Sequence, residues 1–118
     1  MTENKRNIGE CYEKVAAVYL QKQGYEILQY NFRCRSGEID IIAMQGGYLV
    51  FVEVKYRKNN RMGEPLESVS LQKQKKISRA ALYYIQQKGL VEMPVRFDVV
   101  GILGEDIQLV QNAFSFVM

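Results

Sequence analysis

The spacing of apolar and polar residues predicts seven elements, in the order helix, three strands, helix, two strands. Apolar residues recur every three or four positions over residues 8–22 and 71–88, which is typical of amphipathic helices. Asn7 and Ser70 precede these segments as candidate N-caps, and Gly24 and Gly89 follow them as stops. Apolar runs of strand length occupy residues 25–30, 39–43, 49–56, 95–102 and 107–110. This order predicts an α/β fold with a central mixed β-sheet flanked by helices.

A hairpin is expected to join the second and third strands. Gly46-Gly47 lies between them, and this dipeptide is typical of a two-residue turn. Residue numbers that pair across such a hairpin have a constant sum, so Asp40 faces Glu53, and Glu38 faces Lys55. Because side chains alternate along a strand, these four charges project from one face. The other members of that face are apolar: Ile42, Met44, Leu49 and Phe51.

This register places two carboxylates opposite each other beside apolar side chains. Such a pair has Cβ atoms about 5 Å apart and repels by up to about 1 kcal/mol. A divalent cation such as Mg²⁺, which takes one or two carboxylates and several waters, removes the repulsion. The alternative is a structural ion cluster in which Glu38 pairs with Lys55 and the carboxylates point into solvent. Long apolar side chains on the same face favour a metal site with Asp40 and Glu53 as ligands.

The amino-acid composition limits the kinds of active site that the chain can contain. The chain has 118 residues, of which 47% are hydrophobic and 25% charged, as expected of a single domain spanning residues 1–118. It contains no histidine, which excludes serine-histidine hydrolase triads and histidine-ligated zinc. Cys11 and Cys34 lack CxxC spacing and are expected to be free thiols. With no bilayer-length apolar run and no apolar leader, the expected location is the cytoplasm, without a membrane partner.

Basic residues flank the hairpin. The register puts Arg35 near Lys58, so the basic segments before and after the hairpin are expected to converge on the acids. A net charge of +3 is small, and a charge run is most often a solvated loop. Cations gathered around an acidic pair nevertheless suit a polyanionic backbone, although a solvated helix face would also carry those of the second helix. The expected nucleic-acid contacts are Arg33, Arg35, Arg57, Lys58, Arg61, Lys73 and Lys76.

Asp40 is followed, after the hairpin, by Glu53-Val54-Lys55, an arrangement that resembles the PD-(D/E)XK nuclease superfamily. Four further segments widen the likeness: Gly9-x-x-x-Glu13, Gly37-Glu38-Ile39, Val69-Ser70-x-x-Lys73 and Arg96-Phe97-Asp98-Val99-Val100. Together they resemble the YraN family of small bacterial proteins, which is similar to archaeal Holliday junction resolvases. The likeness extends from about residue 8 to residue 100.

The resemblance implies a restriction-endonuclease-like fold and a metal-dependent endonuclease that cleaves DNA, with branched or damaged DNA as candidate substrates. Asp40 and Glu53 would bind Mg²⁺ or Mn²⁺ with the carbonyl of Val54, and Glu13 becomes a third acid of the site. Lys55 is expected to stabilise charge in the transition state rather than act as a base.

Two alternatives and two questions stay open at this point. A non-catalytic nucleic-acid-binding protein that retains the nuclease fold would carry the same residues, and a protein-interaction module would bind neither metal nor DNA. Asp98 is either a fourth acid or the structural partner of a nearby Arg or Lys. Formation of a homodimer, as in the resolvases, is also left open.

Overall fold

The computed structural model describes residues 5–59, 61 and 69–117, and its element order is the predicted one. A chain break predicted at Gly63-Glu64-Pro65 lies outside the described residues. The elements are α1 (Lys5–Lys22), β1 (Glu26–Cys34), β2 (Gly37–Gln45), β3 (Tyr48–Arg57), α2 (Leu71–Lys88), β4 (Val95–Leu103) and β5 (Asp106–Phe114).

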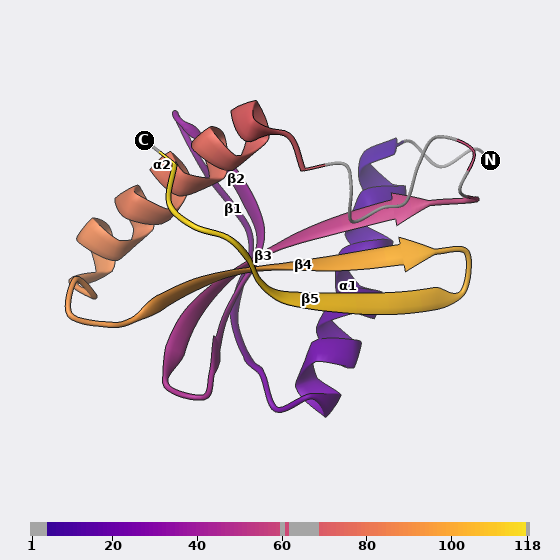
Figure 1. The fold of residues 1–118 in the computed structure, drawn as a ribbon, viewed down its shortest axis with the longest axis horizontal. Coiled ribbons are helices and arrows are strands. Elements are labelled where there is room, and N and C mark those ends of the chain that lie inside the picture. The colour runs from indigo at the N-terminus through magenta and orange to yellow at the C-terminus, as the bar shows by residue number, and fades with distance from the viewer. Residues whose placement is uncertain (1–4, 60, 62–68, 118) are drawn as a thin grey trace.

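The strands form one five-stranded mixed sheet in the order β1-β2-β3-β4-β5 (Figure 1). Strands β3 and β4 run parallel, with α2 as the crossover between them, and the other neighbours are antiparallel. The predicted α/β architecture is therefore confirmed. Neither described helix combines the length and the apolar character that a membrane span requires.

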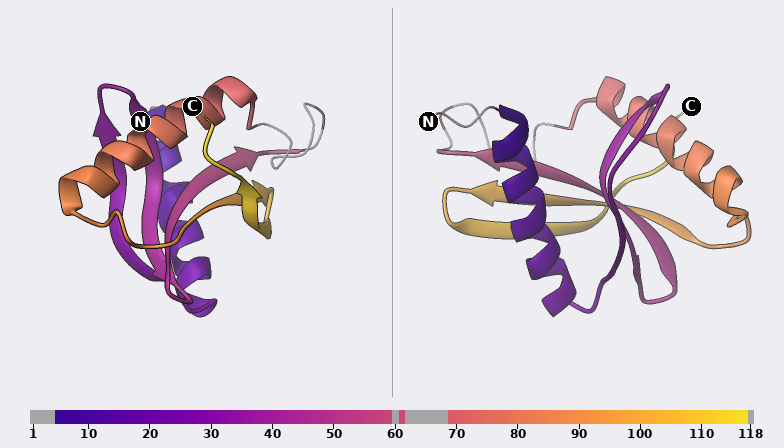
Figure 2. Two further views of the ribbon diagram at one scale, coloured as in Figure 1. Left: turned by 60° about the vertical axis from the view of Figure 1, so that its left-hand side comes forward. Right: turned by 180° about the vertical axis from the view of Figure 1, so that it is seen from behind.

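The two helices cover opposite faces of the sheet (Figure 2). Their apolar stripes face the strands, and burial of each large side chain contributes roughly 1.5–3 kcal/mol. The α1-side core contains Ala16, Ala17, Leu20, Ile41, Ala43, Val50, Val52, Val100 and Ile102. The α2-side core contains Phe32, Ile39, Ile42, Leu49, Phe51, Ile77, Ala80, Ala81, Tyr84, Ile85 and Phe97.

Three of the four predicted helix ends are confirmed. The hydroxyl of Ser70 accepts the Lys73 amide at 3.1 Å, and Gly89 takes a left-handed conformation after α2. Gly24, with φ of 88°, follows α1. The prediction for Asn7 is wrong, because α1 begins at Lys5. An N-cap preference amounts to only about 1 kcal/mol, which is too little to set a helix start against neighbouring residues that also accept helical geometry.

The predicted hairpin register is confirmed over the pairs from Gln45↔Tyr48 to Ile41↔Val52. Gly46 and Gly47 both have positive φ, as the turn requires. Beyond Ile41↔Val52 the two strands separate: β2 continues beside β1, while β3 continues beside β4 (Figures 1 and 2). We call this point of separation the fork.

The structure departs from the sequence predictions at two places before and after the hairpin. The first strand was expected over residues 25–30, but β1 extends to Cys34 and only Arg35-Ser36 turns. Pairing with β2 keeps this segment extended. Arg35 was also expected near Lys58, but the tip of the β1–β2 hairpin points away from the end of β3 (Figures 1 and 2).

The alternation of side chains breaks at Asp40. Ile39 packs in the α2-side core and Ile41 in the α1-side core, although residues two apart on a regular strand share a face. On β1, Asn31 has φ of 49° and falls between the pairs Tyr30↔Ile41 and Phe32↔Ile39, opposite Asp40. The irregular backbone of both strands thus coincides with the fork.

Candidate functional site

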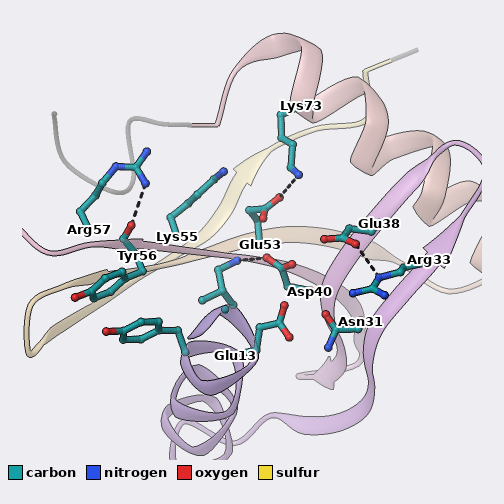
Figure 3. A pocket seen from close by; sticks show the side chains of 13 residues that line it. Glu13, Asn31, Arg33, Glu38, Asp40, Glu53, Lys55, Tyr56, Arg57 and Lys73 are labelled. Carbon is teal, nitrogen blue, oxygen red and sulfur yellow. Dashed lines mark hydrogen bonds and ion pairs between the residues drawn. The ribbon is translucent and has the colours of Figure 1, made fainter. Parts of the chain in front are cut away.

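A cavity of about 410 Å³ lies at the fork (Figure 3). Elements from α1 to α2 contribute to its wall, so residues far apart in sequence meet here. All four predicted catalytic residues, Glu13, Asp40, Glu53 and Lys55, belong to that wall. The lining residues are Gly9, Tyr12, Glu13, Asn31, Arg33, Glu38, Asp40, Glu53, Val54, Lys55, Tyr56, Arg57 and Lys73.

Asp40 is 9% exposed, and its Oδ2 accepts a hydrogen bond of 2.8 Å from the backbone amide of Val54. A partly buried backbone N–H needs an acceptor, and β2 no longer supplies a carbonyl beyond Ile41↔Val52. The carboxylate takes the place of that carbonyl. Asp40 is therefore held in position by the strand that carries Glu53 and Lys55.

Glu53 is buried beside Asp40. Burial is the main cause that raises the pKa of Glu53 to about 9, and a hydrogen bond with Asp40 and the charge of that residue add to it. The ammonium groups of Lys73 and Lys55 act in the opposite direction. Lys73 Nζ lies 3.8 Å from Glu53 Oε2. Without a further cation, the carboxyl group of Glu53 therefore holds its proton at neutral pH.

Glu13 reaches from α1 toward Asp40 and Asn31 (Figure 3). Burial, followed by the charge of Asp40 and a hydrogen bond with it, raises the pKa of Glu13 to about 7, while a hydrogen bond from Asn31 lowers it. Within the described part of the chain, its Oε2 atom is buried and has no hydrogen-bond partner. A buried polar atom without a partner costs roughly 1–3 kcal/mol, so this oxygen is an open acceptor in the wall of the cavity.

The charges of Lys55 and Lys73 both act on Glu53, although only Lys73 forms an ion pair with it. Lys55 lies on β3, two residues beyond Glu53, whereas Lys73 lies in the first turn of α2 (Figure 3). Lys73 was predicted as a phosphate contact, and its pairing with Glu53 was not foreseen. Its place three residues after the N-cap Ser70 was visible in the sequence, but the direction of that first turn depends on how α2 packs.

Three cavity residues were missed by the sequence predictions: Tyr12, Asn31 and Tyr56. Asparagine tolerates positive φ better than most residues, so an asparagine between Tyr30 and Phe32 was an available signal for irregular backbone. The two tyrosines flank Glu13 and Lys55 in sequence, but nothing local indicated that they would meet.

The basic residues divide into two groups. Arg33 and Arg57 line the cavity, and the Arg57 guanidinium donates to the carbonyl of Tyr56 at 2.9 Å. The expectation that Glu38 faces Lys55 is wrong, because β2 has left β3 there and Glu38 pairs with Arg33 at 2.9 Å. The remaining predicted contacts are exposed and lie outside the cavity wall: Arg35, Lys58, Arg61 and Lys76.

Asp98 is structural and does not line the cavity. It is fully buried and accepts hydrogen bonds from the hydroxyl of Tyr25 at 2.6 Å, the guanidinium of Arg96 at 2.9 Å and the amide of Asn112 at 2.9 Å. The interpretation of Asp98 as the partner of a nearby arginine is therefore confirmed. Cys11 and Cys34 are free thiols, also as expected.

The donor set fits a hard divalent cation in part. Asp40 and Glu53 offer carboxyl groups that lie close enough to shift the pKa of Glu53, and Glu13 offers its unpartnered oxygen in the same cavity wall. Over residues 5–59, 61 and 69–117, no three acidic or cysteine side chains converge as a preassembled ligand group. Two carboxylates with water and phosphate oxygens are nevertheless the usual ligands of Mg²⁺, so two close carboxylates satisfy its needs.

The fold and the cavity define a class: a small α/β protein with a buried carboxyl pair and two lysines where a mixed sheet forks. The chain belongs to the UPF0102 family, since the model described as Uncharacterised protein family UPF0102 matches residues 12–102. That span includes every acid and lysine of the cavity.

Two relatives have nearly the same length as this chain. A UPF0102 protein of Lachnoclostridium phytofermentans is 54% identical over 113 residues, which cover 95% of this chain and 96% of that protein. A UPF0102 protein of Caldicellulosiruptor saccharolyticus is 44% identical over 117 residues, covering 94% and 99%. These matches support the resemblance to the YraN family.

Proposed function

We propose that this protein is a metal-dependent endonuclease that hydrolyses phosphodiester bonds in DNA, with branched or damaged DNA as candidate substrates. The observation that carries the proposal is the buried Asp40–Glu53 pair with Lys55 and Lys73 beside it. The resemblance to PD-(D/E)XK nucleases and their restriction-endonuclease-like fold supports the same reaction. The proposed place of action is the cytoplasm.

Asp40 and Glu53 would hold the metal, Mg²⁺ or Mn²⁺, with the carbonyl of Val54, and the open oxygen of Glu13 would join directly or through water. When bound, such an ion polarises the phosphate and lowers the pKa of a coordinated water. The amide of Val54 fixes the direction of Asp40, so one ligand is positioned before binding. Neutralisation of the carboxyl pair by a cation also removes the cost of burying their charges.

The two lysines would stabilise the negative charge that develops on the phosphate during hydrolysis. A positive charge stabilises such developing negative charge most strongly where water is excluded. Lys55 and Lys73 approach Glu53 from β3 and α2, so a phosphate at the carboxyl pair would lie between them (Figure 3). We therefore assign charge stabilisation to Lys55 and phosphate contact to Lys73.

DNA would reach the cavity past Arg33 and Arg57, which line it, and the exposed cations outside it would contact neighbouring phosphates. Each phosphate contact releases counterions and adds salt-sensitive affinity that does not depend on base sequence. The exposed contacts proposed are Arg35, Lys58, Arg61 and Lys76.

The proposal is tested with linear, flapped and four-way-junction DNA in Mg²⁺ or Mn²⁺. Lys55→Ala removes transition-state stabilisation but keeps the carboxyls, so cleavage should fall roughly 10² to 10³-fold while metal binding stays. Asp40→Ala should abolish both cleavage and metal binding. Lys22→Ala and Asp106→Ala, exposed residues outside the cavity, serve as matched controls and should behave as wild type. A wild-type protein that binds these DNAs but cleaves none of them with either metal is a binding protein and not a nuclease.

A further inference from the structure

Two aromatic rings from different elements stack in the wall of the cavity. Tyr12 of α1 and Tyr56 of β3 have ring centroids 3.7 Å apart and ring planes inclined by 16°. Both side chains are half-buried, and the ring of Tyr56, on which Tyr12 stacks, lies to one side of the carboxyl pair (Figure 3). Tyr12 precedes Glu13 and Tyr56 follows Lys55, so each ring is next in sequence to one of the predicted catalytic residues.

The environment of this pair differs from that of the aromatic contacts around Phe51. Phe97 and Tyr84 both contact Phe51 within the α2-side core, where all three side chains are buried. Tyr12 and Tyr56 lie at the edge of the α1-side core and line the cavity. A hydrogen bond with Tyr56 is the main cause that raises the pKa of Tyr12. Its phenol stays neutral at physiological pH and does not repel phosphate.

A partly open aromatic surface beside a phosphate site suits a nucleobase. Bases stack on aromatic side chains whatever their identity, because every base has a π face. In a duplex, both faces of each base are covered by neighbouring bases, so only an unpaired nucleotide can offer a free face. Arg57, which is next to Tyr56 in the chain and also lines the cavity, supplies a cation for the backbone of such a strand.

We propose that the Tyr12–Tyr56 pair is a stacking platform for an unpaired nucleobase adjacent to the phosphate in the cavity. The protein would thereby favour DNA with unpaired nucleotides at the cleavage point over continuous duplex. This inference rests on the proposed nuclease function and specifies its substrate class as DNA with unpaired bases at the cleavage point.

Binding of a 20-nucleotide single strand and of the matched duplex, both in chelator so that neither is cleaved, tests the inference. The ratio of the two affinities is the readout, because the repulsion between phosphate and the metal-free acids affects both. Wild type should prefer the single strand. Tyr56→Leu should lower single-strand affinity roughly tenfold to a hundredfold and leave duplex affinity unchanged, because it removes one stacking surface. Tyr56→Phe, which keeps the ring, should bind as wild type does.

Tyr83→Leu is the matched control, since Tyr83 is 50% exposed on α2 and does not line the cavity. A second measurement uses the wild-type protein alone and therefore does not depend on how the variants fold. A single strand containing 2-aminopurine should lose fluorescence on binding, because stacking quenches that base, and the duplex should show no such loss.

Equal wild-type affinity for the two DNAs, equal effects of Tyr56→Leu and Tyr83→Leu, or an unquenched 2-aminopurine would overturn the stacking inference. Cleavage by the wild-type protein would still support the nuclease. Absence of binding to either DNA in chelator would also overturn this inference, and the cleavage assay with metal would then decide the nuclease proposal by itself.

Discussion

The backbone amide of Val54 donates a 2.8 Å hydrogen bond to the carboxylate of Asp40 where the two strands of the hairpin separate. The bond connects the point where the sheet forks with one of the proposed metal ligands. Separation of β2 from β3 opens the cavity, and it also leaves the Val54 amide to be satisfied by a side chain. The acid that fills this role is the one that the sequence places opposite Glu53.

Asp40→Ala should lose metal binding with little change in the stability of the metal-free protein. The substitution removes a like charge from beside Glu13, and Val54 lines the cavity, where water can replace the carboxylate as acceptor for its amide. Thermal unfolding checks this. Mg²⁺ or Mn²⁺ at about a hundred times its dissociation constant should stabilise wild type by about 2.7 kcal/mol and leave Asp40→Ala unaffected. A metal-induced shift of equal size in both proteins would place the ion elsewhere.

The metal-free protein should lose stability as pH rises from about 4.5 to about 9. Glu13 and Glu53 have folded-state pKa values of about 7 and about 9, above the ordinary value of 4.5, so the folded protein binds these protons more tightly than the unfolded chain. The contribution of these two carboxyl groups to stability is therefore greatest below the ordinary pKa and is lost as pH rises through the folded values, opposite to the usual behaviour of paired carboxylates. Urea unfolding at pH 5, 7 and 9 in chelator measures it. Glu53→Gln should flatten the profile, whereas Glu105→Gln, an exposed control, should not.

Asp98→Ala should destabilise the protein by about 3–5 kcal/mol, because it leaves the partly buried guanidinium of Arg96 without its partner. Denaturant unfolding gives the value. The metal-induced gain in melting temperature should persist in this variant, in contrast to Asp40→Ala, because Asp98 lies outside the cavity wall. Loss of that gain in a folded Asp98→Ala protein would contradict the structural role.

Gly37→Ala should cost roughly 1–3 kcal/mol, since a Cβ there would lie 3.0 Å from the carbonyl oxygen of Lys76 and 3.2 Å from its Cβ. The glycine of the Gly37-Glu38-Ile39-Asp40 segment thus allows α2 to approach β2. Gly9→Ala is the contrasting control: its Cβ would meet nothing within 4 Å in α1, so it should gain up to about 1 kcal/mol. Calorimetric unfolding compares the two, and equal effects would rule out steric contact as the cause.

Arg57→Ala and Arg33→Ala should weaken DNA binding to similar extents for unrelated sequences. Each should also reduce the slope of log affinity against log salt concentration by roughly one, the value of one lost phosphate contact. Fluorescence anisotropy between about 50 and 200 mM salt measures both quantities. Lys22→Ala, at the far end of α1, should leave the slope unchanged. A change in sequence preference without a change in slope would indicate base recognition by these arginines.

The sequence by itself determined the order of the elements and the register of the hairpin. These depend on local interactions: two glycines with positive φ define the turn, and pairing from Gln45↔Tyr48 to Ile41↔Val52 follows from it. The likeness around Asp40, Glu53 and Lys55 also required no long-range information. Ser70 and Gly89 marked the ends of α2 for the same reason, because capping acts within one turn.

Only the tertiary structure decided where the hairpin pairing stops. The period-two alternation holds while a ladder is continuous, and it fails at Asp40, where β2 stays with β1 and β3 stays with β4. Because of that separation, Glu38 pairs with Arg33, and the tip of the β1–β2 hairpin points away from the end of β3. The packing of helices on opposite faces brought Glu13 and Lys73 to the fork, and the burial of Asp98 under Arg96 made that acid structural. These outcomes depend on contacts between residues distant in sequence. A local sequence pattern carries no information about the free energies of such contacts.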